Sequence, residues 1–299
     1  MRKGIWYALA AYGIWGLFPL YWKPLHDIPA LQIIGHRIGW SFILLVVIIL
    51  VTKQWGAFRA ATTNKRTLLA YTATAVLITI NWLVYVWAIN AGYIVESSLG
   101  YFINPLLSVL LGVIFLREKL RTWQWVPVGL AALGVLIVSV AYGHFPWISI
   151  SLALSFGLYG LVKKKAPLNS LYGLTLETGI VFIPALIYLI TVDVQGQGAF
   201  LHTDIVSNLL MIGAGAVTAI PLMLFSSAAQ RIPLSMVGIL QYITPTTQFL
   251  LGVFLYKEPF TLIQLVGFSL VWLALIFFTI EGFVARRARQ MEPMAAAAD

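Results

Sequence analysis

The chain has 299 residues, of which 61% are hydrophobic and only 10% are charged. Soluble domains carry about 25% charged residues, so the composition excludes a water-soluble domain and predicts a protein embedded in the lipid bilayer. The net charge of +9 does not indicate a nucleic-acid partner, because the basic residues are scattered between apolar runs and form no stripe. The absence of cysteine excludes disulfides and thiolate sites.

Ten apolar runs follow one another along the chain, and each is close to the length of about 20 residues that a helix needs to cross a bilayer. We therefore predict an all-α integral membrane protein with ten transmembrane helices. The first run reaches Trp22 and no small-residue cleavage site follows it, so we expect a retained helix rather than a signal peptide. The predicted spans are 4–22, 31–52, 67–90, 94–116, 122–142, 147–163, 170–192, 205–230, 233–256 and 261–283.

The basic residues are distributed unevenly between the connections that join these runs. With the N-terminus in the cytoplasm, sixteen of the 19 basic residues fall in cytoplasmic segments, only Lys23 and Lys257 fall in outer loops, and Arg37 lies within a span. Loops rich in lysine and arginine stay on the cytoplasmic side. The bias predicts cytoplasmic N- and C-termini, and it supports the count of ten because one missed span would invert every later loop.

The sequence contains an internal repeat. YGIWGL at 12–17 matches FGLYGL at 156–161, and residues 88–128 align without a gap with residues 228–268 at an offset of 140. The repeat predicts two five-helix units, followed by a short cytoplasmic tail that we expect to be disordered. These three parts cover residues 4–142, 147–283 and 284–299.

An odd number of helices in each unit has a consequence for topology. The second unit must enter the membrane from the opposite side, so the two units are inverted relative to each other. Inverted repeats are typical of secondary transporters, in which the substrate binds near the midplane between the repeats and access alternates between the two sides. Duplication for stability alone is the alternative interpretation.

Two charged residues lie inside predicted spans at equivalent positions of the two repeats. They are Arg37, which follows His36, and Glu177. Charges at membrane depth are costly and usually face a cavity or a partner, so we predict that Arg37 and Glu177 contact substrate or exchange partners. His36 is a candidate proton carrier. The alternative is that the two charges extend to opposite membrane surfaces and that His36 is held by hydrogen bonds in the helix packing.

Polar and aromatic side chains are expected to complete the substrate site. Asn81 and Tyr85 share one face of a helix, and Trp15 and Tyr159 lie between glycines that allow neighbouring helices to approach. Packing and interhelical hydrogen bonds are the alternative roles for these side chains. The full predicted substrate site consists of Trp15, His36, Arg37, Asn81, Tyr85, Asn104, Tyr159, Glu177, Gln241 and Tyr242.

Two prolines occupy equivalent positions in the middle of predicted spans. Asn104-Pro105 and Thr244-Pro245 are 140 residues apart, and a proline inside a helix removes one backbone hydrogen bond and produces a kink. Paired breaks in the two halves of a transporter indicate a binding site or a moving joint. We therefore predict hinges at Pro105 and Pro245.

Two glutamates end equivalent apolar runs. Glu118 lies in LLGVIFLREKL and Glu258 in LLGVFLYKEPF. Inverted topology places them on opposite sides of the membrane, so they cannot form a paired-carboxylate site. We interpret each as part of a polar turn that ties a helical hairpin by hydrogen bonds, with gating at the two mouths as the alternative.

Two long segments resemble a known family of permeases. They are NWLVYVWAINAGYIVESSLGYFINPLLSVLLGVIFLREKL (81–120) and AIPLMLFSSAAQRIPLSMVGILQYITPTTQFLLGVFLYKEPF (219–260). Together with the His36-Arg37 and Glu177-Thr178 pairs, they resemble the RarD-like branch of the EamA-type permeases, in the drug/metabolite transporter superfamily. The resemblance covers residues 4 to 283.

This resemblance implies a fold, a location and an activity. The fold has ten helices in two inverted EamA repeats, the location is the bacterial inner membrane, and the activity is transport of a small metabolite or drug-like molecule, with multidrug efflux as one form. Related small multidrug exporters use a glutamate of the first helix for proton exchange. Here residues 4–22 contain no acidic residue, which argues against proton coupling by that route.

The sequence therefore predicts a secondary transporter that has a small-molecule substrate, a proton as candidate coupling ion, and no cofactor or metal. ATP drive is not expected, because the chain lacks a G-x-x-x-x-G-K-[ST] loop. A lipid or amphiphile flippase of the same fold and a non-transporting membrane protein are the alternatives. An enzyme is not expected, because the chain lacks HExxH, GxSxG and a pair of intramembrane aspartates. The substrate, the direction of transport and the oligomeric state are left open.

Overall fold

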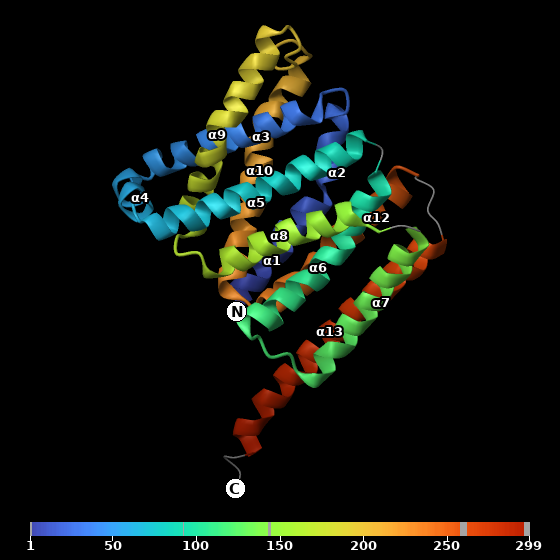
Figure 1. The fold of residues 1–299 in the computed structure, drawn as a ribbon. Helices are drawn as coiled ribbons and strands as arrows, with labels where there is room; N and C mark the ends of the chain where they lie inside the picture. The colour runs from blue at the N-terminus through green and yellow to red at the C-terminus, as the bar shows by residue number, and fades with distance from the viewer. Residues whose placement is uncertain (1, 92, 143–144, 258–261, 296–299) are drawn as a thin grey trace.

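The structure is a computed structural model that describes residues 2–91, 93–142, 145–257 and 262–295. Within these ranges the chain is helical, without strands (Figure 1). An α-helix satisfies its own backbone hydrogen bonds, which lipid cannot do, so this architecture suits a chain made of apolar runs.

The helices follow one another with short connections. The first half contains α1 (Arg2–Gly16), α2 (Phe18–Trp22), η1 (Lys23–Leu25), α3 (Ala30–Val51), α4 (Trp55–Thr62), α5 (Lys65–Asn90), α6 (Ile94–Leu116), η2 (Thr122–Gln124) and α7 (Trp125–Tyr142). The second half contains α8 (Trp147–Lys165), α9 (Ser170–Val194), α10 (Ile205–Arg231), α11 (Leu234–Gln241), α12 (Ile243–Leu250), a π-helical turn η3 (Leu251–Leu255) and α13 (Leu262–Ala295).

Helix starts are capped where the sequence provides an acceptor. The Asn169 side chain accepts a hydrogen bond from the backbone of Tyr172 at the start of α9. Asp204 accepts from the backbone of Val206 and Ser207 at the start of α10. The hydroxyl of Ser207 also donates to Asp204, and these bonds hold the pKa of that carboxyl below its usual range. Both caps satisfy backbone donors that a helix leaves free at its first turn.

Six helical segments of the described residues are long and apolar enough to cross a membrane, so the chain is a multi-pass membrane protein. They are Ala30–Val51, Lys65–Ala88, Leu99–Leu116, Ser170–Val194, Ile205–Arg231 and Leu234–Leu255. The helices α1, α7, α8 and α13 occupy the other four predicted positions. Helix length and hydropathy therefore establish six of the ten predicted membrane-spanning helices.

The structure differs from the predicted spans at three places, each with a local cause. The run 4–22 is divided after Gly16, because Pro19 lies in the first turn of α2 and has no N–H to continue α1. The run 233–256 is divided between Gln241 and Ile243, just before Pro245. Residues 284–295 of the expected disordered tail are instead part of α13, which is helical to Ala295 because arginine, glutamine, methionine and alanine favour helix, and the last four residues lie outside the described ranges.

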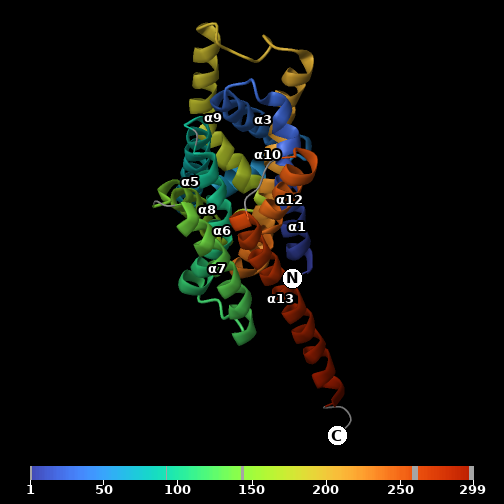
Figure 2. The same cartoon turned by 90° about the vertical axis from the view of Figure 1, so that its right-hand side faces the viewer.

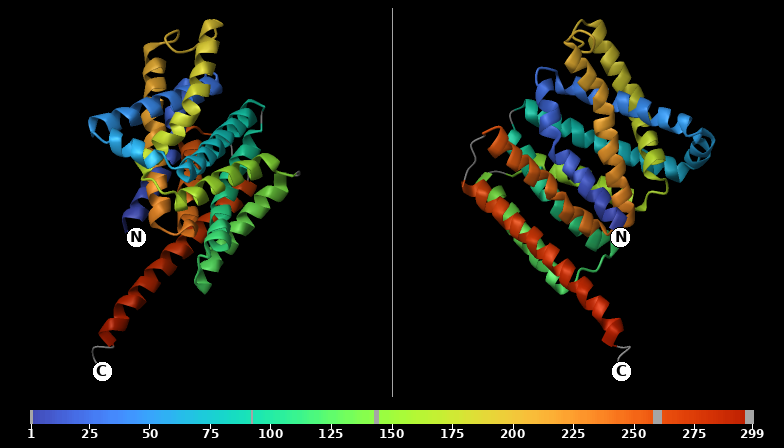
Figure 3. Two further views of the ribbon diagram at one scale, coloured as in Figure 1. Left: turned by 60° about the vertical axis from the view of Figure 1, so that its left-hand side comes forward. Right: turned by 180° about the vertical axis from the view of Figure 1, so that it is seen from behind.

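The helices pack in pairs that join the two halves of the chain. Helix α1 packs on α10, α6 on both α8 and α11, α3 on α9 and α10, and α7 on α13. Figure 1 and Figure 2 show α7 beside α13 at the edge of the bundle, with the C-terminal part of α13 projecting beyond it. The view from behind in Figure 3 shows α1 alongside α10 and α12. The bundle interior is therefore built by helices from both halves.

A close approach between α6 and α11 depends on one glycine. A Cβ atom on Gly238 would lie 2.6 Å from the backbone oxygen of Pro105 and 2.9 Å from the Cβ of Ser108. Small residues allow helices to approach in a membrane. Gly238 thus lets the two halves meet beside the predicted hinge.

One end of the bundle is closed by contacts between helix ends, and we call it the N-terminal face. The Glu118 carboxylate accepts hydrogen bonds from the backbone of Leu234 (2.6 Å) and Ser235 (2.9 Å) and from the Ser235 hydroxyl (2.7 Å). The Lys164 ammonium donates to the Ile232 carbonyl at 2.5 Å. Further contacts join Gln230 to Leu168, Leu168 to Tyr71, and Arg231 to Tyr7.

Glu118 therefore contacts a different part of the chain from the one that the sequence predicts. We expected it to tie its own hairpin, but its carboxylate instead caps the start of α11 in the other half of the chain. Its repeat equivalent, Glu258, lies outside the described residues.

Candidate functional site

A cavity of about 340 Å³ lies between the two halves of the bundle. Such a volume is at the lower end of the range of about 300–1,000 Å³ for small-molecule sites. The cavity is lined by Trp15, Phe18, Pro19, Trp22, Arg37, Ile78, Asn81, Trp82, Tyr85, Gly100, Tyr101, Asn104, Leu152, Phe156, Thr218, Leu222, Gln241, Thr244, Pro245 and Gln248.

The cavity lies toward the end of the bundle opposite the N-terminal face. More than half of its lining residues come from the C-terminal halves of α1, α5 and α11 and from the N-terminal halves of α3, α6 and α8, and the rest come from α2, α10 and α12. The N-terminal face is made by the other ends of α1, α5, α6, α8 and α11. The same helices therefore form the cavity at one end and the closed face at the other.

Equivalent residues of the two repeats meet in the cavity. Four pairs that are 140 positions apart contribute both members to the lining: Ile78 with Thr218, Trp82 with Leu222, Tyr101 with Gln241, and Asn104 with Thr244. The residue types within each pair differ. Equivalent positions of the two repeats therefore line the cavity with side chains of different chemistry.

Arg37 is the charged residue of the cavity lining. Its Nε donates a hydrogen bond to the Thr218 hydroxyl at 2.9 Å. The guanidinium carbon lies 5.1 Å from the ring centroid of Trp22 and 4.7 Å from that of Trp82. Arginine over an indole face is stabilised by a cation–π interaction. These contacts orient the guanidinium, but none of the salt bridges among the described residues involves it.

Amide side chains supply further polarity. Asn81 donates to the Leu152 carbonyl at 2.9 Å and the Ser155 hydroxyl at 3.0 Å, and Gln248 donates to the Trp15 carbonyl at 3.1 Å. By contrast, Asn104 Oδ1 and Gln241 Oε1 are buried and have no hydrogen-bond partner among the described residues. Buried acceptors are normally satisfied, so Asn104 and Gln241 are cavity-lining amides whose oxygens still lack a donor.

Aromatic side chains form much of the remaining wall. Trp15 and Phe156 meet edge to face with ring centroids 5.7 Å apart, and Phe18 and Trp22 do so at 5.5 Å. Tyr85 meets the ring of Tyr101 at 6.0 Å. The cavity thus combines aromatic side chains with a small number of polar groups, as ligand sites commonly do.

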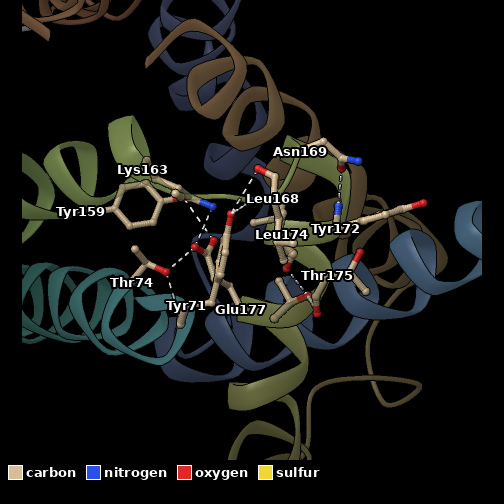
Figure 4. A network of polar contacts seen from close by, with 12 residues as sticks. Tyr71, Thr74, Tyr159, Lys163, Leu168, Asn169, Tyr172, Leu174, Thr175 and Glu177 are labelled. Carbon is tan, nitrogen blue, oxygen red and sulfur yellow. Dashed lines mark hydrogen bonds and ion pairs between the residues drawn. The ribbon is translucent and has the colours of Figure 1, made fainter. Parts of the chain in front are cut away.

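A second polar cluster is buried outside the cavity. Lys163 lies 2.7 Å from the Glu177 carboxylate, and the two side chains are 0% and 2% exposed. The Thr74 hydroxyl donates to the same carboxylate, as does Tyr159 at 3.4 Å. Figure 4 shows Lys163 and Thr74 converging on Glu177, with Tyr71 and Tyr159 beside them.

The structure brings six of the ten predicted site residues together in the cavity. They are Trp15, Arg37, Asn81, Tyr85, Asn104 and Gln241. Of the remaining four, Glu177 and Tyr159 belong to the buried ion-pair cluster. Tyr242 donates to the Phe102 carbonyl at 3.2 Å in the helix packing, and His36 is buried with its ring 5.0 Å from that of Phe200.

Arg37 and Glu177 do not form a pair. Arg37 lines the cavity, whereas Glu177 is bound by Lys163. Glu177 is buried, and Arg37 is half-buried with its side chain held by Thr218 in the cavity lining, so the interpretation that they extend to opposite membrane surfaces is not supported. Lys163 was expected in a cytoplasmic segment, but α8 continues to Lys165 and Lys163 faces the interior. The pairing was hidden because Lys163 begins a run of three lysines.

The two predicted hinges differ. Pro245 lines the cavity just after the break between α11 and α12. Pro105 lies inside α6, which is continuous around it, and packs on the side of that helix away from the cavity, near Pro127 and Ala131.

Several lining residues were missed by sequence reasoning. Helical spacing offered a signal for some of them, because Ile78 and Trp82 share one stripe of α5 with Asn81 and Tyr85. Tyr101 and Asn104 are three residues apart and therefore lie on the same face of α6. Thr218 and Gln248 had no such signal, because their roles depend on contacts between distant helices.

Comparisons with known proteins agree with this architecture. A model of the EamA-like transporter family matches residues 2–140 and 146–280. The chain is 47% identical over 292 residues to "Uncharacterized transporter YojE" of Bacillus subtilis, covering 96% of this chain and 97% of the relative. It is 44% identical over 289 residues to "Protein RarD" of Streptomyces exfoliatus, covering 96% and 92%. A solved crystal structure at 14% identity has a TM-score of 0.70, covers 93% of this chain and 97% of that chain, and supports the fold alone.

Proposed function

Because the chain belongs to the EamA-like transporter family, in its RarD-like branch, and is a membrane transporter, we propose that it is a secondary transporter for a small organic molecule. The observation that carries this proposal is the cavity in which equivalent residues of both repeats meet. Substrate sites of secondary transporters lie at such an interface near the membrane midplane. The family description and the name of the Bacillus subtilis relative refer to transporters rather than enzymes, which fits a binding role for the polar groups of the cavity.

The proposed mechanism is alternating access between two inverted five-helix repeats, residues 4–142 and 147–283, with ten membrane-spanning helices. The two stretches matched by the family model support this division. The present state has a cavity at one end and a closed N-terminal face at the other. Opening that face requires Glu118 to release the start of α11 and Lys164 to release Ile232.

The proposed setting is the bacterial inner membrane, with both termini in the cytoplasm. The unequal distribution of lysine and arginine supports this orientation, under which the cavity lies on the outer side and the N-terminal face on the inner side. A coupling proton is part of the proposal, and the buried His36 is its candidate carrier. A lipid flippase would need a lateral opening that admits acyl chains.

Flux through purified protein tests this proposal. In reconstituted vesicles we expect saturable, protein-dependent flux of at least one compound from a panel of small organic acids, amides and aromatic drugs. Gln241→Ala removes a buried cavity amide and should lower that flux about tenfold, equivalent to about 1.4 kcal/mol. Gln195→Ala, on an exposed residue after α9, should match the wild type.

Two results would count against the proposal. One is the absence of saturable flux across the whole panel. The other is wild-type flux in Gln241→Ala, because the substrate would then pass elsewhere.

A further inference from the structure

The charge of the cavity lining indicates what kind of molecule fits it. Arg37 contributes a positive charge, while no aspartate or glutamate lies among the described residues that line the cavity. Glu177, which occupies the position equivalent to Arg37 in the second repeat, is already paired with Lys163 and cannot neutralise Arg37. An unneutralised charge at membrane depth costs several kcal/mol. Because the described lining residues provide no carboxylate for Arg37, a substrate with a negative charge can act as its counter-ion.

The guanidinium of Arg37 is held in one orientation, which favours binding of a carboxylate over binding of an anion without paired oxygens. Thr218 holds Nε and the indoles of Trp22 and Trp82 flank the planar group. The terminal nitrogens therefore remain for a ligand. Arginine presents paired N–H groups that match the two oxygens of a carboxylate.

The rest of the lining adds two requirements. The buried oxygens of Asn104 and Gln241 have no donor among the described residues, so a ligand with a hydroxyl or N–H group would satisfy them. The aromatic side chains around Trp15 and Trp82 favour a ligand with an aromatic ring, which they can contact face-on or edge-on.

We propose that the cavity binds an aromatic monocarboxylate that carries a hydroxyl or N–H donor. The carboxylate pairs with Arg37, the ring lies among the aromatic side chains, and the donor reaches Asn104 and Gln241. This proposal rests on the cavity being the transport site, but it concerns equilibrium binding and is testable without flux.

Four compounds of nearly the same shape test it by calorimetry on purified protein in a lipid-free detergent. They are 4-hydroxyphenylacetate (anion with donor), phenylacetate (anion without donor), 4-hydroxyphenylacetamide (neutral) and tyramine (cation). We expect 4-hydroxyphenylacetate to have a Kd at least tenfold lower than the amide and tyramine, and severalfold lower than phenylacetate. Arg37→Gln should weaken binding of the two acids at least tenfold and binding of the neutral amide much less, so that the preference for the acid is lost.

A matched control separates the site from general charge. Arg59→Gln makes the same substitution on exposed α4 and should bind all four compounds as the wild type does. A wild-type Tm in detergent shows that Arg37→Gln is folded, and Arg37→Lys should retain part of the preference for acids.

The possible failures are distinguishable. Equal affinities for acid, amide and amine, no saturable binding at millimolar concentrations, or acid binding that survives Arg37→Gln would each overturn the carboxylate site. Tighter binding of dioctanoyl phosphatidylglycerol than of any carboxylate would overturn it in favour of a lipid headgroup. Carboxylate binding with no flux in vesicles would confirm the site and contradict the transport function.

Discussion

Single residues decide whether a charge in this bundle is structural or available. Lys163 and Glu177 neutralise each other inside the packing, and the carboxylate gains further hydrogen bonds from Thr74 and Tyr159. Arg37 has hydrogen-bonded and aromatic neighbours but no such counter-charge. The first group is therefore built to hold helices together, and the second to meet a ligand.

Breaking the buried pair should destabilise the protein strongly. Removing one partner leaves an uncompensated buried charge, which costs about 3–5 kcal/mol, whereas replacing both with apolar residues is often neutral. We expect Lys163→Met and Glu177→Leu each to lower the Tm in detergent, and the double variant to recover most of the loss. Equal and additive losses in the two single variants would show that the pair does not act as a unit.

The sequence carried the information for part of the site. Asn81 and Tyr85 were predicted because helical spacing places them on one face, and Arg37 because a charge inside an apolar run is unusual. Lys163 was missed because it adjoins two further lysines at the expected membrane boundary. Its partner lies on another helix, 14 positions later, and no local pattern shows which way either side chain points.

At the scale of helices, the N-terminal face depends on the cap that α6 gives to α11. Glu118 satisfies two backbone donors at the start of α11, whose own cap position is Pro233 without a side-chain acceptor. Negative charge at a helix start is also favoured by the helix dipole. One carboxylate thus closes the space between two helices from different halves.

Removing this cap should loosen the N-terminal face. Glu118→Ala is expected to cost about 1–2 kcal/mol, as the loss of a strong N-cap does, and to lower the Tm of the purified protein. Lys119→Ala changes the exposed neighbour of Glu118 and should leave the Tm unchanged. If the two variants melt together at the wild-type temperature, the cap contributes nothing to closure.

The break between α11 and α12 is the expected moving joint. Pro245→Ala restores a backbone N–H that can bond the Gln241 carbonyl and continue α11 into α12. We expect slower flux in vesicles with little change in substrate Kd. Pro184→Ala, on an exposed proline inside α9, is the matched control. Wild-type rates in Pro245→Ala would remove the hinge from the mechanism.

For the whole molecule, the repeat was readable from sequence because its aligned residues keep a fixed offset. The separation of roles between its halves was not, since it depends on which neighbours each residue contacts in the folded bundle. Trp15 and Arg37 line the cavity, while their equivalents Tyr159 and Glu177 lie in the buried ion-pair cluster. This arrangement is the one expected if one pathway is open while its counterpart is closed.

Alternating access requires the cavity and the N-terminal face to be exposed in turn and never together. Because the chain contains no cysteine, introduced single cysteines can measure the exposure of each end directly. Single cysteines at Gln248, in the cavity, and Leu168, in the N-terminal face, report the two ends. A cysteine at exposed Lys119 serves as the labelling reference. Maleimide should react quickly with Gln248→Cys and slowly with Leu168→Cys.

Adding Glu118→Ala to release the closed end should reverse this order, raising the rate at Leu168→Cys and lowering it at Gln248→Cys, with the reference unchanged. If the two rates rise together or the rate at Gln248→Cys does not fall, the two ends open independently and alternating access is contradicted.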